Sequence, residues 1–209
     1  MHFTLLISAL AASASALASR INTIPITMSS KSYDWKPMPG TRSFCETSID
    51  PVWRVSFVRS DPIETVIHNA CVAMMPECAF RDRLSNGTIC SATVDYPLDG
   101  NKYYKPPNVD AVRHNGTDWQ LIPIMFVVRP GGRVNGTPDT PVFWRVEDCY
   151  GYLFQFFEKL MPEGCRNSEG YRFMGQLAVA EGGSLADAKP GSLAGTKFFV
   201  TFDNTGGGD

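Results

Sequence analysis

Six cysteines restrict the fold of this chain more than any other feature: Cys45, Cys71, Cys78, Cys90, Cys149 and Cys165. None of them forms the Cys-x-x-Cys pairs typical of structural zinc sites, so the sequence predicts no metal site. An even number of thiols instead predicts up to three disulfides, for which fifteen pairings are possible.

The first 18 residues have the pattern of an export signal. They form an uncharged apolar run that ends in alanine and serine, and Ala16 and Ala18 fit the small-residue cleavage pattern. No later apolar run approaches the about 18 residues that a membrane-spanning helix needs. We therefore expect residues 1–18 to be a signal peptide, and the protein to be secreted and extracellular, without stable membrane insertion. Oxidising conditions there would favour disulfides.

Composition and motifs narrow the function. The net charge is −2 and no run of like charge occurs, which argues against a nucleic-acid partner. Motifs of serine hydrolases, zinc peptidases and nucleotide-binding loops are missing from the sequence, and oxidised cysteines leave no thiol nucleophile. We expect a non-enzymatic protein without a cofactor. His68 is expected to be a partly exposed helix residue and His114 a solvated loop residue.

The order of predicted elements is similar in the two halves of the chain. A strand over 51–58, a helix over 62–75, a strand over 88–97 and, after a long polar loop, a strand over 119–130 are expected from periodicity and turn residues. The second half predicts a strand over 141–146, a helix over 147–161, and strands over 171–183 and 196–203. Trp53 and Trp144 stand at matching places, which favours a duplicated unit over about 51–132 and 141–203.

Two such strand-helix-strand-strand units predict an α+β fold, with a mainly antiparallel sheet, two helices on one face and disulfide staples. The alternative is a β-barrel with peripheral helices. Residues 19–44 are expected to be an N-terminal arm or linker, residues 45–203 a single globular domain of two pseudo-repeats, and residues 204–209 a flexible tail.

Helix geometry restricts the disulfides. Cys71 and Cys78 would lie about 10 Å apart along a helix, and the second helix would separate Cys149 from Cys165 by about 18 Å. We therefore expect neither of these pairs. Bonds from helices to strands or to the N-terminal arm are predicted instead, with Cys45 tying down the arm.

Three Asn-Gly-Thr triplets predict N-glycosylation on exposed loops at Asn86, Asn115 and Asn135. Exposed aromatic rings are a less specific signal than these triplets, and they predict a sugar-binding surface. The candidate binding residues are Tyr103, Tyr104 and Trp119.

The segment from Glu163 to Gly182 resembles the fungal killer-toxin-like secreted proteins. The matching positions are Gly164, Cys165, Gly175, Leu177 and Val179, whereas Asn167 and Ser168 stand where the family has a second cysteine. The resemblance covers about twenty residues and implies a disulfide-stapled α/β sandwich. It also implies a small secreted toxin or host-directed effector, in the style of cysteine-rich fungal effectors.

The sequence therefore predicts a secreted, non-enzymatic effector or toxin-like protein that acts on a host or competitor by binding. Its partner would be a host protein or a cell-surface glycan, and the protein is expected to be a monomer. One alternative is a secreted carbohydrate-binding module, and another is an unrecognised secreted hydrolase that uses paired carboxylates.

Overall fold

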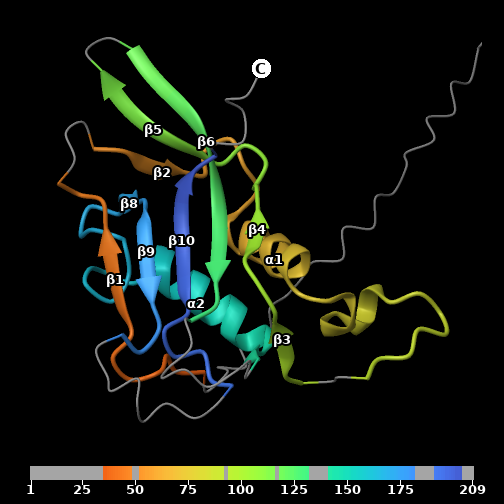
Figure 1. Cartoon of the computed structure of the whole chain (residues 1–209). Coiled ribbons are helices and arrows are strands. Elements are labelled where there is room, and N and C mark those ends of the chain that lie inside the picture. The colour runs from red at the N-terminus through yellow and green to blue at the C-terminus, as the bar shows by residue number, and fades with distance from the viewer. Residues whose placement is uncertain are drawn as a thin grey trace, which may run out of the picture. The chain divides into compact units, whose positions relative to one another are not determined.

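The computed structural model describes residues 35–48, 52–91, 94–115, 118–131, 141–181 and 191–203. Its helices are α1 (Ile63–Met74) and α2 (Val146–Glu158), with two short 3-10 helices, η1 (Glu77–Ala79) and η2 (Arg81–Arg83). The strands are β1 (Arg42–Cys45), β2 (Arg54–Ser56), β3 (Tyr96–Leu98), β4 (Lys102–Tyr104), β5 (Asp110–Asn115), β6 (Asp118–Arg129), β7 (Val142–Trp144), β8 (Arg172–Phe173), β9 (Gly175–Ala178) and β10 (Lys197–Phe202). Their arrangement confirms an α+β fold with a mainly antiparallel sheet and two α-helices (Figure 1).

One eight-stranded sheet has the order β1-β9-β10-β6-β5-β2-β8, and β4 also pairs with β6. The long strand β6 pairs with β10 over Ile124–Arg129 and with β5 over Asp118–Pro123. Only Met174 separates β8, at one end of this order, from β9, near the other end. The strand path therefore turns back on itself, and the sheet is strongly curled.

Gly175 explains why the single strand predicted over 171–183 divides into β8 and β9. Its φ is 145°, a value that side chains rarely allow, and a Cβ there would lie 2.1 Å from the Phe44 carbonyl oxygen. A glycine at this position lets β1 approach β9 closely and lets the chain change direction between its two short strands.

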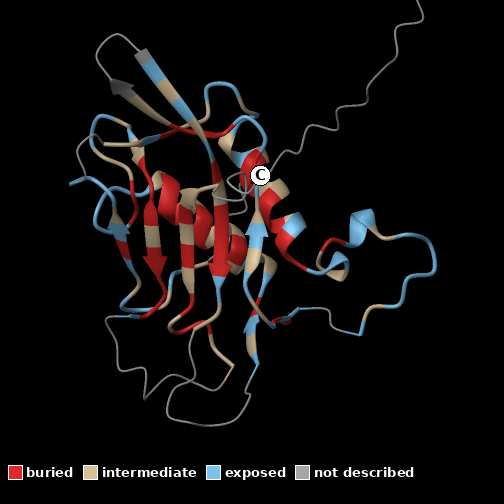
Figure 2. Ribbon diagram, turned by 45° about the horizontal axis from the view of Figure 1, so that its top comes forward, coloured by how far each residue is buried: buried red, intermediate tan, exposed pale blue. Residues whose placement is uncertain are grey.

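The helices pack against each other and against the sheet. The buried residues of α1 include Val66, Ile67 and Ala70, which follow helical spacing. At the start of α2, the Asp148 carboxylate accepts a hydrogen bond from the Arg145 backbone N–H at 2.9 Å, which satisfies one terminal donor. Buried residues gather on α2 and on the central strands, where the hydrophobic core lies (Figure 2).

Three disulfides are present: Cys45–Cys165, Cys71–Cys149 and Cys78–Cys90. The two pairings that helix geometry argued against do not occur. The expectation that the bonds link helices to strands or to the arm is wrong for Cys71–Cys149, because α1 and α2 lie side by side and bring these Cα atoms to 5.8 Å. The Cys78–Cys90 bond closes a loop after α1.

The internal duplication is not confirmed by the arrangement of the strands. The Trp53 strand, β2, lies in the large sheet between β5 and β8, whereas the Trp144 strand, β7, pairs with β3 in a separate two-stranded sheet. Trp144 is fully buried, but Trp53 stands just before β2 and is half-buried. The two tryptophans therefore occupy different environments in the fold.

Two other predicted boundaries are wrong. The strand expected over 88–97 is reduced to β3, and Ile89 is 93% exposed on the disulfide-closed loop. The polar loop expected over 98–118 instead contains β4 and β5. The residues of β5 are mostly polar, so hydrophobic periodicity does not reveal a strand whose pairing is set by distant neighbours.

Residues 35–41 lie against α2 through contacts that depend on a glycine inside this helix. The Trp35 indole N–H donates to the Asp148 carboxylate at 3.1 Å, and its ring meets Tyr152 edge-on at 4.9 Å. A Cβ at Gly151 would lie 2.3 Å from the Trp35 ring. A glycine inside a helix costs about 1 kcal/mol relative to alanine. Here the close packing of Trp35 on the helix offsets this cost.

Gly151→Ala is expected to have opposite effects in two backgrounds. In the wild-type chain it should lower the free energy of unfolding by about 1–2 kcal/mol, because the new methyl group displaces Trp35. In a Trp35→Ala chain it should raise this free energy by up to about 1 kcal/mol, because only helix propensity remains. Urea unfolding of the four proteins in this double-mutant cycle measures both effects. The same sign in both backgrounds would contradict the packing account.

Candidate functional site

The three aromatic residues predicted as binding candidates do not form one site. Tyr103 is 55% exposed, and Tyr104 is half-buried against Phe126. Both lie in β4, which pairs with β6 at Phe126 and Val127. Trp119 is 67% exposed near the other end of β6, seven residues before Phe126, which corresponds to about 23 Å along a strand.

The β5–β6 hairpin presents a different cluster of exposed side chains. It projects beyond the rest of the sheet (Figure 1). The strand register places Leu121 opposite Val112, and Val112 opposite Arg54 of β2. Opposed residues share one face of a sheet, and Trp119 joins them because it is two residues from Leu121.

Tyr171 extends this cluster beyond β2. The Arg54 guanidinium carbon lies 3.7 Å from the centroid of the Tyr171 ring, a cation–π contact. We call the five residues Arg54, Val112, Trp119, Leu121 and Tyr171 the hairpin face. Tyrosine, tryptophan and arginine are the residue types that most often carry the binding energy of protein interfaces.

The opposite side of the hairpin is anchored to the body of the protein. Ala111 is fully buried, and the Arg113 side chain donates a hydrogen bond to the Gln120 side-chain carbonyl. The Arg113 guanidinium also lies 4.8 Å from the centroid of Trp53, whose ring meets Phe202 edge-on at 5.2 Å. These contacts fix the base of the hairpin, so the hairpin face is supported by ordered structure.

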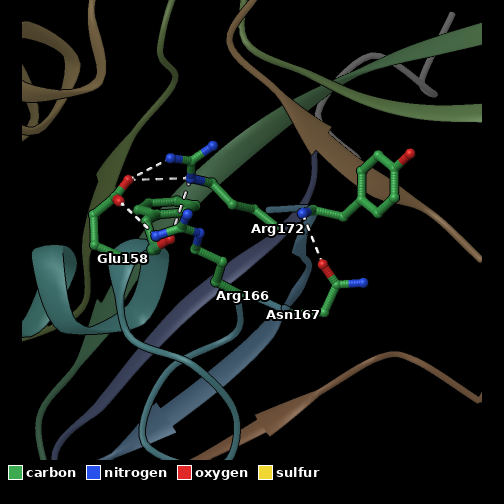
Figure 3. A network of polar contacts seen from close by, with 6 residues as sticks. Glu158, Arg166, Asn167 and Arg172 are labelled. Atoms are coloured by element: carbon green, nitrogen blue, oxygen red, sulfur yellow. Dashed lines mark hydrogen bonds and ion pairs between the residues drawn. The ribbon is translucent and has the colours of Figure 1, made fainter. Parts of the chain in front are cut away.

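A polar network holds the segment that presents Tyr171 (Figure 3). The Glu158 carboxylate contacts Arg172 at 2.5 Å and Arg166 at 3.5 Å. Arg172 also donates to the Phe157 carbonyl at 3.1 Å, and the Asn167 side-chain oxygen accepts from the Tyr171 N–H at 2.8 Å. The network joins the end of α2 to β8 and fixes the turn before it, so the Tyr171 backbone is well ordered.

The hairpin face contains one charged residue, Arg54, in a chain whose net charge is −2. Arg59 at the edge of the face is paired with the buried Asp110 carboxylate at 2.6 Å. Arg54 instead rests against the Tyr171 ring, and within the described ranges no ion pair joins it to a carboxylate. Arg54 therefore offers a cation that a carboxylate of a partner can approach.

Two open hollows lie on either side of residues 36–41, with volumes of about 660 and 540 Å³. In the first, Arg145 pairs with Asp95 at 2.7 Å, and the Asp148 carboxylate accepts from the Trp35 indole. In the second, Glu158 is engaged by the two arginines of the polar network. Among the described residues that line the hollows, Asp95, Asp148 and Glu158 are therefore already engaged within the protein.

In the ranges that the structure describes, no group of three or more histidine, cysteine or acidic residues is placed to hold a metal ion. His68 lies half-buried on α1, where it contacts Tyr150 and Arg83. No helix among the described residues is long and apolar enough to cross a membrane.

The predicted glycosylation sites are placed only in part. Asn86 is exposed in a turn where the Thr88 N–H donates to the Ser85 carbonyl at 3.1 Å. Asn115 ends β5, and Asn135 lies outside the described residues. Modification of these asparagines stays a prediction, as do the arm, tail and signal assignments.

Comparisons with protein-family models, with curated proteins and with solved structures find no match to this chain. The resemblance to killer-toxin-like proteins therefore stays a prediction. Its matched residues lie in the loop after α2, where Gly164 and Cys165 are buried, and in β9, which contains Gly175 and Leu177. The sequence alone does not identify three members of the hairpin face, which are Arg54, Leu121 and Tyr171. Only the pairing of strands that are distant in the sequence brings them together.

Proposed function

We propose that this protein is secreted and acts, without catalysis, as an effector or toxin-like binder whose hairpin face docks on a protein partner. The observation that carries the proposal is the exposure of Trp119 and Leu121, at 67% and 46%, on a projecting and well-anchored hairpin. Three disulfides are compatible with an exported protein, since oxidising compartments preserve them.

The chemistry of the hairpin face favours a protein partner over a glycan. Val112 and Leu121 add branched aliphatic surface, which suits the apolar centre of a protein interface. The guanidinium of Arg54 is held in place by Tyr171 and can pair with carboxylates. The partner surface is therefore proposed to combine apolar side chains with aspartate or glutamate.

Binding of fluorescently labelled protein to intact plant and fungal cells tests this function. We expect saturable binding to one of these cell types, and loss of binding after the cells are treated with a protease. Treatment with wall-degrading glycosidases should leave the binding intact. Binding that resists protease and disappears with glycosidase would overturn the proposal in favour of a glycan ligand.

The carbohydrate-binding module remains the second candidate, because Tyr103 and Trp119 both expose aromatic rings. A sugar stacks on such rings while their polar tips stay hydrated. The two rings lie near different ends of β6, so an extended ligand could contact both, whereas a single sugar unit could not. The glycosidase treatment distinguishes this candidate from the protein-binding one.

A further inference from the structure

We propose that His68 is an acid-sensitive latch that holds the loop from Glu77 to Ser91 against the two α-helices. This loop leaves α1 through η1 and η2 and is closed by the Cys78–Cys90 disulfide. The disulfide ties the ends of the loop to each other, and the Tyr96 hydroxyl donates to the Cys78 carbonyl at 2.8 Å near its base. Contacts farther along the loop must therefore come from side chains of η2 and its neighbours.

Arg83 makes the polar contact of η2 with α1. Its guanidinium lies 2.9 Å from the Nε2 atom of His68. Arginine only donates hydrogen bonds, so Nε2 must accept here and must carry no proton. The remaining proton of the neutral imidazole is then on Nδ1, which donates to the Tyr150 hydroxyl of α2. His68 thus joins three elements only while it is neutral.

Protonation of His68 removes the acceptor on which this arrangement depends. The new proton on Nε2 would point at the Arg83 guanidinium, and two positive charges would then face each other. Asp82, the neighbouring charged group on η2, partly offsets this repulsion. Tyr150 cannot compensate, because burial raises its pKa to about 12 and keeps it neutral.

Packing around the His68 ring also favours its neutral form. The His68 ring stacks on Tyr150 and meets Phe80 edge-on, each at 6.0 Å between centroids. Burial, followed by the charge of Arg83, lowers the pKa of His68 below its usual 6.5. The neutral form is therefore favoured in the closed loop. The latch has its full strength above pH 6.5 and weakens as the pH falls toward the lowered pKa.

Amide hydrogen exchange measures the opening of this loop. The reporters are the N–H groups of Phe80, Arg83 and Leu84, which donate to the carbonyls of Glu77, Phe80 and Arg81. After correction for intrinsic exchange, their protection should fall several-fold between about pH 7.5 and 5.5. Protection of the β10 amides should stay constant, which excludes global unfolding.

Two variants make the result specific. His68→Gln keeps an acceptor for Arg83 but cannot be protonated, so its loop protection should not change with pH. Arg83→Ala, at an exposed position, removes the donor to Nε2 and should show low protection at every pH. Wild-type protection that is independent of pH would overturn the latch, and so would an unchanged pH dependence in His68→Gln. If His68→Gln does not fold, the Arg83→Ala result decides: retained wild-type pH dependence would overturn the proposal.

Discussion

Replacing Cys71 and Cys149 together by alanine is expected to lower the free energy of unfolding by about 4 kcal/mol, a large part of the stability of a typical domain. The bond closes a chain segment of 78 residues and therefore strongly restricts the unfolded state. Both cysteines are fully buried where α1 meets α2, so the bond also lies in the core. Urea unfolding of the oxidised proteins measures the loss.

The Cys78–Cys90 pair provides the matched control. Its bond closes only 12 residues, in a loop outside the helix interface, so Cys78→Ala with Cys90→Ala should cost about 3 kcal/mol or less. A larger loss from this pair than from Cys71 and Cys149 would contradict the account. Peptide mapping of the wild-type disulfides should assign all three bonds, if cleavage after Glu77 is included to separate Cys71 from Cys78.

Trp144→Ala is expected to destabilise the protein far more than Trp53→Ala. Trp144 is 1% exposed in the core, and truncation of such a residue costs about 3–5 kcal/mol through lost burial and a cavity. Trp53 is half-buried against Phe202 and Arg113, so its loss should cost about 1–2 kcal/mol. Thermal and urea unfolding compare the two variants.

The same pair of variants tests the internal duplication. Equivalent positions in a duplicated unit would be expected to have similar environments and similar costs. Equal losses for Trp53→Ala and Trp144→Ala would contradict the different environments of the two tryptophans. A clear difference would show that Trp53 and Trp144, despite their matching places in the sequence, have different structural roles.

Much of the secondary structure was predictable because it depends on local pattern. The helical spacing of Val66, Ile67 and Ala70 marks α1, and a long apolar run marks β6. The short strands β4 and β5 were not predictable, because they contain many polar residues and are defined by pairing with β6. Hydrophobic periodicity does not reveal these two strands, because it carries no information on their pairing with β6.

The candidate site was harder to predict than the fold. Trp119 was correctly identified as an exposed aromatic residue. Tyr103 and Tyr104, which were predicted with it, lie in β4 beside the other end of β6. The hairpin face depends on the register that aligns Arg54 with Val112, and on the pairing of β2 with β8 that brings Tyr171 beside Arg54. Neither of these pairings has a local sequence signal, apart from Gly175 at the start of β9.

Competition for binding sites on intact cells tests most directly whether the hairpin face binds the partner. Unlabelled wild-type protein should displace labelled protein from the cell type that binds it. A Trp119→Ala, Leu121→Ala variant should need at least about tenfold more protein to do so, as expected when interface anchors are removed. Tyr103→Ala, which truncates an exposed aromatic residue of β4, should compete like the wild type. Equal competition by the Trp119, Leu121 variant, with its folding verified by circular dichroism, would contradict the central claim.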